Sequence, residues 1–170
     1  MRSALRQNAI LGALACAALL GFGYYLQYAQ GQEPCPLCLV QRGFYFGLLA
    51  VFAAAAAHAP WGSARIGWGV AALVFAGGGL ATAGRQVWLQ HLPADQVPAC
   101  GPDLAYMLAT LPFMRTLEKL FAGSGQCAEV KWRFLGLSIA EWSLAWFAVF
   151  AGLALWMVFS KEKGERPLFR

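Results

Sequence analysis

Two cysteines separated by two residues, Cys35 and Cys38, are the side chains in this sequence most able to do chemistry. They lie in the stretch QEPCPLCLVQRGFYF, between prolines and the start of an apolar run. At this spacing each thiol can resolve a disulfide that the other has formed, which suits reversible exchange. A disulfide between them would close a very small loop and so stabilise a fold only weakly. The pair therefore indicates redox chemistry more than structural cross-linking.

The residues around Cys38 favour its thiolate form. Cys38 lies about where a helix is expected to begin, and the positive end of a helix dipole stabilises an anionic sulfur. Arg42 follows one helical turn later on the same face, where its charge would stabilise a thiolate or another anion beside it. The alternative is that Arg42 is a membrane-edge residue whose charge only reaches the lipid headgroups.

The composition is that of an integral membrane protein. Hydrophobic residues make up 59% of the 170 residues and charged residues only 12%, whereas soluble domains carry about 25% charged residues. Such a chain has too few polar residues to cover the surface of a soluble fold. The net charge of +5 does not indicate nucleic-acid binding, because the basic residues form no aromatic-interleaved patch and several flank apolar runs.

Four apolar segments, residues 9–28, 39–58, 66–84 and 142–160, approach the length that a membrane-spanning helix needs. We therefore expect an all-α fold, a four-transmembrane-helix bundle that forms one membrane domain over residues 1–170. The first segment is interpreted as an uncleaved span, because it is long for a signal peptide and no clear cleavage site precedes Gly31. The loops at residues 29–38 and 85–141 then share one side of the membrane.

The basic residues predict the orientation of the bundle. Seven of them fall on one side, which the positive-inside rule assigns to the cytoplasm together with both termini: Arg2, Arg6, Arg65, Lys161, Lys163, Arg166 and Arg170. Arg42 and Arg85 break the rule, because they lie at the outer ends of spans. The two loops then face the periplasm of a bacterium-like cell and carry four of the five cysteines. An even number of cysteines on the oxidising side is typical of disulfides. Cys16 falls in the middle of the first span and is expected to be an inert packing residue.

The long loop is expected to contain two kinds of segment. Cys100 and Cys127 lie in stretches rich in proline or glycine, which are typical of irregular chain. Residues 104–121 show apolar side chains at helical spacing, interrupted by Pro112. They are predicted to form a short interfacial helix on the outer leaflet or, alternatively, a packed lid. A disulfide between Cys100 and Cys127 would close about 26 residues and contribute roughly 3 kcal/mol, but an attacking thiolate could also reach it.

The four outer cysteines have two further interpretations, passive structural bridges or a zinc site. Zinc is disfavoured because the second pair lacks the usual ligand spacing. If the cysteines cycle, they need an electron acceptor, and the sequence has neither a dinucleotide-binding motif nor a haem-binding CxxCH. The glycine-rich GGGLATAG lies inside a span, where small residues allow close helix packing. A lipid-soluble quinone remains, and side chains near its level supply charge, donors and an aromatic face: Arg42, Arg85, Gln86, Trp88 and Gln90.

The motifs PCPLCLVQR, RQVWLQHLP…AC and GQCAEVKWRFLGLSIAEW resemble those of the DsbB family of membrane thiol–quinone oxidoreductases. The likeness covers essentially the whole chain. It implies that a Cys100–Cys127 disulfide oxidises a periplasmic DsbA-type thioredoxin-like protein. Electrons would then pass to the Cys35–Cys38 pair and on to ubiquinone or menaquinone in the bacterial inner membrane.

The resemblance also implies individual roles. Cys100 matches the cysteine that forms the mixed disulfide with the partner, Cys38 matches the cysteine whose thiolate contacts the quinone, and Arg42 matches the supporting arginine. One residue departs from the pattern, since a relative has histidine after the arginine matching Arg85, where this chain has Gln86. That role is not transferred to His91, which is expected to be a core or loop residue. The competing functions are an accessory membrane protein with passive disulfides and a thiol carrier that imports reductant.

Overall fold

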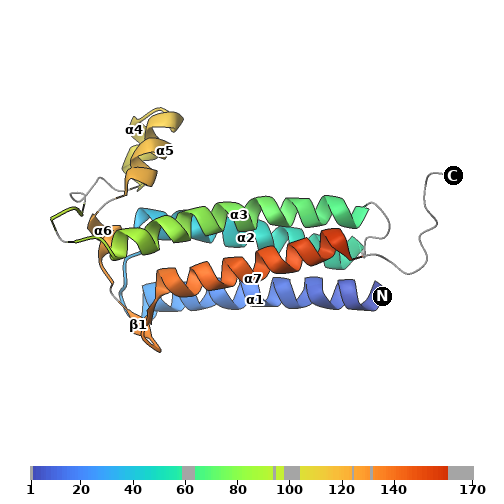
Figure 1. Ribbon diagram of the computed structural model, residues 1–170. Helices are drawn as coiled ribbons and strands as arrows, with labels where there is room; N and C mark the ends of the chain where they lie inside the picture. The colour runs from blue at the N-terminus through green and yellow to red at the C-terminus, as the bar shows by residue number, and fades with distance from the viewer. Residues whose placement is uncertain are drawn as a thin grey trace.

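The computed structural model describes residues 2–58, 64–93, 95–97, 104–123, 125–130 and 132–160. Four helices are long and apolar enough to cross a membrane, and they run side by side as a bundle (Figure 1). The chain is therefore a multi-pass membrane protein with a four-helix bundle, as its composition predicted. Its elements, in chain order, are α1 (Arg2–Ala29), α2 (Pro36–His58), α3 (Ala64–Gln90), α4 (Leu104–Thr110), α5 (Phe113–Ala122), α6 (Gly125–Ala128), β1 (Arg133–Phe134), β2 (Leu137–Ser138) and α7 (Ile139–Phe159).

The ends of the spanning helices differ from the expected spans for local reasons. α2 begins at Pro36 rather than at residue 39, because proline suits the first position of a helix, where its missing N–H has no partner to lose. α7 begins at Ile139 rather than at residue 142, because Ser138 and Glu141 form a capping box. The N–H of Glu141 donates to the Ser138 hydroxyl at 3.3 Å, and the Glu141 carboxylate accepts from the N–H of Ser138 at 2.6 Å.

Small residues on α3 let the helices of the bundle approach closely. A side chain at Gly79 would collide with the ring of Phe147 on α7, and one at Gly78 would collide with Phe44 on α2. The space around Gly77 is open. Two of the three consecutive glycines therefore accommodate aromatic rings of neighbouring helices, which is the packing predicted for small residues in a membrane.

A buried arginine joins α3 to α7 at one end of the interface between these two helices. Nη1 of Arg65, in the first turn of α3, donates to the carbonyls of Met157 and Val158 at 3.1 and 3.2 Å. These carbonyls belong to the last turn of α7, where a helix has no N–H groups of its own to satisfy them. The contact fixes the start of α3 to the end of α7.

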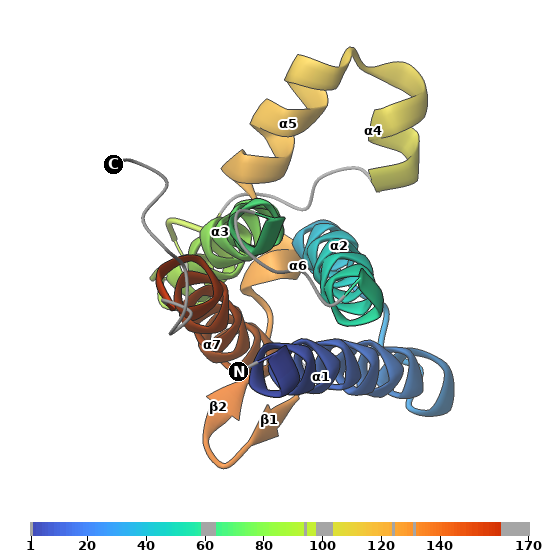
Figure 2. The ribbon, with the colours of Figure 1, turned by 90° about the vertical axis from the view of Figure 1, so that its right-hand side faces the viewer.

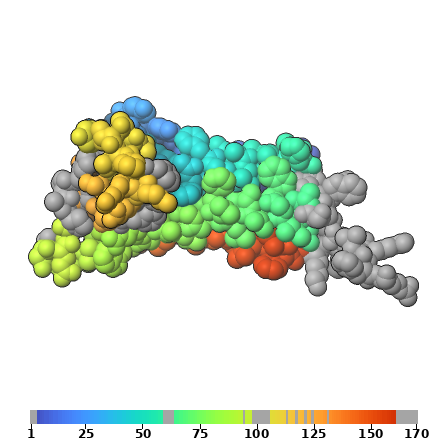
Figure 3. Space-filling view, turned by 90° about the horizontal axis from the view of Figure 1, so that it is seen from above, coloured from blue at the N-terminus to red at the C-terminus, as the bar shows by residue number. Residues whose placement is uncertain are grey.

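The segments between α3 and α7 gather at the opposite end of the bundle. α4 and α5 project to one side of the bundle, and the β1–β2 hairpin projects to the other (Figures 1 and 2). In the space-filling view α4 and α5 form a lobe over this end of the molecule (Figure 3). The expected amphipathic segment is helical and breaks before Phe113, with Pro112 at the N-cap of α5. Its position on the outer leaflet stays a prediction.

Gly123 places the chain after α5 close against α3. Its φ of +84° lies in the region that glycine adopts without strain. Its N–H donates to the carbonyls of Lys119 and Leu120, which closes the last turn of α5. A side chain at this position would overlap Leu89 of α3. The close approach brings the short helix α6 alongside the C-terminal end of α3.

The two-stranded hairpin before α7 was not expected from the sequence. Arg133 pairs with Ser138 and Phe134 with Leu137 in antiparallel register. The connecting residues Leu135 and Gly136 both have positive φ, +53° and +83°. Positive φ at both central residues is what a tight turn of the I′ type needs to join two strands.

Candidate functional site

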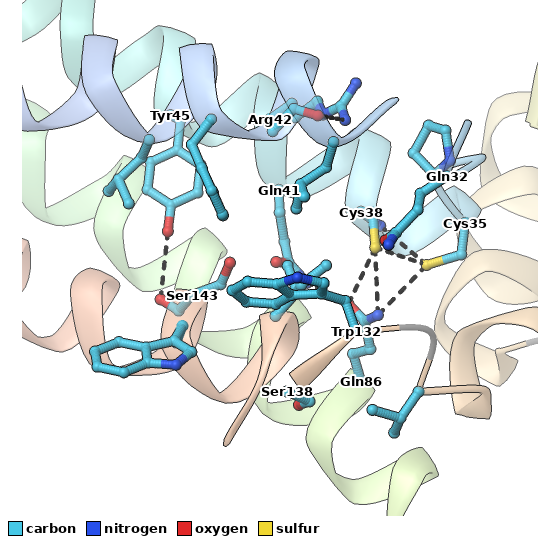
Figure 4. Close-up of a pocket in the computed structure, with 18 of the residues that line it drawn as sticks. Gln32, Cys35, Cys38, Gln41, Arg42, Tyr45, Gln86, Trp132, Ser138 and Ser143 are labelled. Atoms are coloured by element: carbon cyan, nitrogen blue, oxygen red, sulfur yellow. Dashed lines mark hydrogen bonds between the residues drawn. The ribbon is translucent and has the colours of Figure 1, made fainter. Parts of the chain in front are cut away.

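The two thiols of the CxxC motif lie in contact at the start of α2. Cys35 directly precedes the helix and Cys38 lies in its first turn, so that their Sγ atoms are 2.9 Å apart. The backbone N–H of Cys38 also donates to the Cys35 sulfur at 3.4 Å. Figure 4 shows the two sulfurs directed toward each other and toward the side chain of Gln86. The start of the helix therefore holds the sulfurs at a distance suited to exchange between them.

The side-chain amide of Gln86, on α3, contacts both sulfurs. Its amide nitrogen is 3.3 Å from Cys38 Sγ and 3.5 Å from Cys35 Sγ, and the contacts are drawn in Figure 4. Its amide oxygen accepts a 2.7 Å hydrogen bond from Nε2 of Gln41 on α2. Gln86 was predicted to contact a quinone, and here its amide contacts the thiols.

Gln41 was not predicted as a site residue, although the sequence contains a signal for it. It follows Cys38 by three residues, so it lies on the same face of α2. It is a polar residue inside a membrane span, which is costly without a specific partner. Only 3% of its surface is exposed, and the partner is Gln86.

Cys127 is brought to the same place by α6. It is buried in an apolar cluster with Cys35, Leu37, Leu89 and Leu120, and it shares a hydrogen bond with the Cys35 thiol. This hydrogen bond, the one with Cys38 and burial raise the pKa of the Cys35 thiol well above its ordinary value. The sequence places these two cysteines in different loops, and the structure brings their thiols together.

The two remaining cysteines are separate from this cluster or outside the described chain. Cys100, and with it the expected Cys100–Cys127 pairing, lies outside the residues that the structure describes. Cys16 is completely buried among the core residues of the bundle, with Phe52 and Phe150 in the same core.

Arg42 extends from α2 toward α1. Its guanidinium donates to the side-chain oxygen of Gln27 and, at 2.9 Å, to the carbonyl of Gly23. It also lies over the ring of Tyr24, 4.8 Å from the ring centre. Figure 4 shows it pointing away from the thiols, although the side chain borders the adjoining cavity. The predicted effect on the Cys38 thiolate remains a hypothesis.

A cavity of about 350 Å³ adjoins the thiol pair. Residues of α1 and α7 are part of its lining. These two helices contact each other far less than α1 contacts α2 or α7 contacts α3. Aromatic side chains form much of its wall, including those of Tyr45, Trp142 and Trp146, while Cys38 and Gln41 contribute polar groups. The size and the mostly apolar lining are typical of a small-molecule site.

Arg85 lies near the C-terminal end of α3. Nη2 of Arg85 donates to the carbonyl of Ala122 at 3.1 Å, and the guanidinium lies 4.1 Å from the ring centre of Trp88. Among the described residues that line the cavity, Gln86 is present and Arg85 is not. The quinone contact of Arg85 stays a prediction.

Gln90 and His91 end the third span with different surroundings. Gln90 lines the cavity and accepts a 2.7 Å hydrogen bond from the hydroxyl of Ser138. His91 is largely exposed, with Nδ1 2.8 Å from the carbonyl of Val87 and Nε2 4.0 Å from the carboxylate of Glu141. His91 is therefore an exposed residue at the end of the helix.

The fold and the site together define a class of protein. The chain crosses the membrane several times and holds adjacent thiols from two different segments at one end of the bundle, beside an apolar cavity. Such an arrangement belongs to a membrane thiol–disulfide oxidoreductase.

Comparison with known proteins identifies the family. The sequence profile described as "Disulfide bond formation protein DsbB" matches residues 5–157. A protein named Disulfide bond formation protein B from Marinobacter nauticus is 48% identical over 145 residues, covering 85% of this chain and 86% of the relative. A protein of the same name from Hahella chejuensis is 50% identical over 143 residues, covering 84% of this chain and 86% of the relative. A third protein of this name, from Xanthomonas campestris pv. campestris, is 41% identical over 171 residues, covering 99% of this chain and 98% of the relative.

The chain belongs to the DsbB family, and the resemblance seen in its motifs is confirmed. It is accordingly an oxidoreductase that forms disulfide bonds.

Proposed function

We propose that this protein oxidises a periplasmic DsbA-type protein and passes the electrons to a membrane quinone. The net reaction converts the dithiol of the partner into a disulfide and reduces ubiquinone or menaquinone to the quinol. Two electrons and two protons move from the partner to the quinone, so the reaction balances without another reactant. The bundle would lie in the bacterial inner membrane, with both termini in the cytoplasm and the thiol cluster at the periplasmic side.

The observation that carries this proposal is the contact of Cys127 with Cys35. Cys127 comes from the long loop and Cys35 from the CxxC motif, and they share a hydrogen bond. Thiol–disulfide exchange needs direct approach of one sulfur to another. The contact supports a transfer of the oxidising equivalent between the two cysteine pairs.

The exchange would run in three steps. The dithiol of the partner first reduces a Cys100–Cys127 disulfide and becomes a disulfide itself. The Cys127 thiolate then attacks Cys35 of a Cys35–Cys38 disulfide, forming a Cys127–Cys35 bond and releasing Cys38 as a thiolate. Cys100 next displaces Cys35 from Cys127, which restores the first disulfide and leaves Cys35 and Cys38 reduced.

The last transfer would return the CxxC motif to its oxidised form. Cys35 and Cys38 form a disulfide, and their two electrons and two protons pass to the quinone. Both cysteines line the cavity, and Cys35 also bonds to Cys127, which supports exchange with the loop at Cys35 and leaves Cys38 to the electron acceptor. This division of roles agrees with the one that the family resemblance implies.

The cavity suits a quinone headgroup. Its aromatic walls, from Tyr45, Trp142 and Trp146, provide flat apolar surfaces, and Gln41 and Gln90 add amide groups to the lining. Two of the spanning helices, α1 and α7, contribute to its lining, and a quinone dissolves in the lipid around such helices. A quinone bound there would supply the two-electron acceptor, while Cys38 would be the sulfur next to it.

The proposal is tested with the purified protein in lipid nanodiscs, a reduced DsbA-type protein and a soluble ubiquinone analogue. We expect one quinol for each partner disulfide, and no turnover in Cys35→Ser or Cys38→Ser. Turnover that survives either substitution would favour passive structural bridges. Quinone-independent reduction of an oxidised partner by an added dithiol would favour a thiol carrier that imports reductant instead.

A further inference from the structure

The amide group of Gln86 is held in one orientation by its neighbours. Its nitrogen carries two hydrogens and lies within 3.5 Å of both Cys35 Sγ and Cys38 Sγ. Its oxygen accepts from Gln41 Nε2 at 2.7 Å and, at the longer distance of 3.7 Å, from the Cys38 thiol. If the Gln86 amide were turned over, its NH2 group would face the NH2 group of Gln41. Two opposed donors would be costly here, because only 3–4% of either glutamine is exposed. The hydrogen bond from Gln41 therefore favours the orientation in which the Gln86 amide nitrogen, rather than its oxygen, is closest to the two sulfurs.

The orientation is the one that favours negative charge on sulfur. A thiol sulfur accepts hydrogen bonds weakly, whereas hydrogen bonds to an ionised group are stronger. Two N–H groups aimed at two sulfurs would therefore act mainly when either sulfur is a thiolate. The amide adds no charge of its own, so it avoids the cost of a further buried ion.

A purely structural role for this glutamine pair is less consistent with the contacts. Polar side chains do join membrane helices by hydrogen bonds, and the bond between Gln41 and Gln86 joins α2 to α3. Such a role would be complete with that single bond. The donors of Gln86 instead meet the reactive sulfurs, while the guanidinium of Arg42 donates to residues of α1.

We propose that Gln41 is a positioning residue that holds the two N–H groups of Gln86 on the sulfurs of Cys35 and Cys38, so that a thiolate formed on either sulfur keeps a donor. The amide can serve both sulfurs without moving to another position. This inference rests on the proposed function, because it concerns the thiolate that the exchange steps release from the CxxC motif.

Other ionisable groups near the thiol pair must be considered in a test that varies pH. Cys127 of α6 bonds to Cys35. Arg42 of α2 borders the adjoining cavity, and Glu33 and Glu129 line its loop side. All of them are unchanged in the variants that follow, so a difference between the variants reports the glutamine pair.

The test measures alkylation of the reduced protein by iodoacetamide as a function of pH, with the labelled cysteine identified by mass spectrometry. Only the thiolate reacts, so the pH midpoint for Cys38 reports how well its anion is stabilised. We expect Gln86→Leu to raise this midpoint by about one pH unit, a tenfold loss of thiolate at a given pH below the midpoint. Gln41→Leu should raise it by a smaller amount, because the amide then turns freely.

Gln41→Glu provides a second variant of nearly the same size and shape. While its new carboxyl group is protonated, the O–H donates to Gln86 as the native amide does. Once ionised, the carboxylate can only accept, so it draws the N–H groups of Gln86 away from the sulfurs. We therefore expect wild-type alkylation at low pH and a loss of thiolate once the introduced carboxyl group ionises. Packing alone would not produce such a biphasic profile.

Thr82→Val is the matched control for the removal of a buried polar group. Thr82 lies one turn before Gln86 on α3, is buried, and donates only to carbonyls of its own helix among the contacts described. The Cys38 midpoint in this variant should equal that of the wild type. A wild-type midpoint in either leucine variant would overturn the inference, as would an equal shift in Thr82→Val.

The assay uses neither quinone nor partner, so the two proposals fail separately. Absence of quinone reduction by the wild-type protein would refute the proposed function and leave the alkylation profiles interpretable. Unchanged profiles would refute the role of Gln41 and leave the proposed function standing.

Discussion

Cys127, on the short helix α6, lies against the thiol of Cys35 at the start of α2 and shares a hydrogen bond with it. The two cysteines come from segments separated by the whole third span. Their contact makes Cys35 the sulfur of the CxxC motif that a loop thiolate meets first. Several outcomes depend on that geometry.

Removal of Cys127 should trap the partner. In Cys127→Ala, the Cys100 thiolate attacks the disulfide of an oxidised DsbA-type protein and releases one thiol of that partner, and no loop cysteine remains to resolve the product. We expect a mixed disulfide between the partner and Cys100, detected by non-reducing electrophoresis and peptide mapping. Cys127→Ala combined with Cys100→Ala is the control and should give no adduct. A mixed disulfide through Cys38 would show that the two pairs have been assigned the wrong roles.

The raised pKa of Cys35 predicts slow alkylation of that thiol in the reduced protein. Its hydrogen bonds with Cys127 and Cys38 and its burial hold the proton on sulfur, so less thiolate exists at a given pH than for a free cysteine of pKa about 8.5. At pH 8 we expect Cys35 to react at least about tenfold more slowly in the folded protein than after denaturation. The rate should keep rising above pH 9.

Cys127→Ala removes the largest contribution to that shift and is therefore the informative comparison for Cys35. The pH midpoint of Cys35 alkylation should move down in this variant, measured on the same peptide by mass spectrometry. An unchanged midpoint would mean that the contact between the two thiols does not persist in the reduced protein.

Arg42 tests whether a charge at the edge of the cavity serves the quinone. Arg42→Leu should weaken quinone binding, with KM for the quinone raised by about tenfold or more, equivalent to about 1.4 kcal/mol. Arg42→Lys should retain more function but not all, because an ammonium cannot reproduce the planar fork that reaches both Gln27 and Gly23. Steady-state quinone reduction against quinone concentration separates the three proteins. Wild-type kinetics in Arg42→Leu would leave Arg42 as a membrane-edge residue only.

The glycines of α3 allow a prediction about stability with a control on the same helix. Gly79→Ala places a methyl group where the Phe147 ring now lies, and overpacking of this kind costs about 1–3 kcal/mol. We expect unfolding at lower SDS concentration, followed by circular dichroism. Gly77→Ala, where the space is open, should unfold like the wild type. Equal unfolding of the two variants would show that α3 and α7 can separate without cost.

Much of the membrane architecture could be predicted because it depends on local properties of the sequence. Apolar length indicated all four spans, and Pro112 indicated the break between α4 and α5. The start of α7 was placed too late because the capping box of Ser138 and Glu141 extends the helix beyond its apolar run. The hairpin escaped prediction because a leucine with positive φ occupies its turn, and leucine gives no turn signal.

The candidate site was predicted in its residue types and less well in its contacts. The spacing of Cys35 and Cys38 indicated a reactive pair, since it is a local feature. The approach of Cys127 depends on how Gly123 packs against Leu89, a contact between distant segments that no sequence period records. Gln86 was selected for its polarity, but its bond to Gln41 requires that α2 and α3 be placed relative to each other.

Arg65 and Ser138 have a joint consequence for how the cavity can change size. Arg65 fastens the start of α3 to the end of α7, and Ser138 fastens the start of α7 to Gln90 at the end of α3. This antiparallel pair is thus secured at both of its extremities, whereas α1 packs mainly along α2. A wider or narrower space between α1 and α7 therefore requires that α1 move relative to α3 and α7 together, because α7 cannot swing away from α3 while both of these contacts hold.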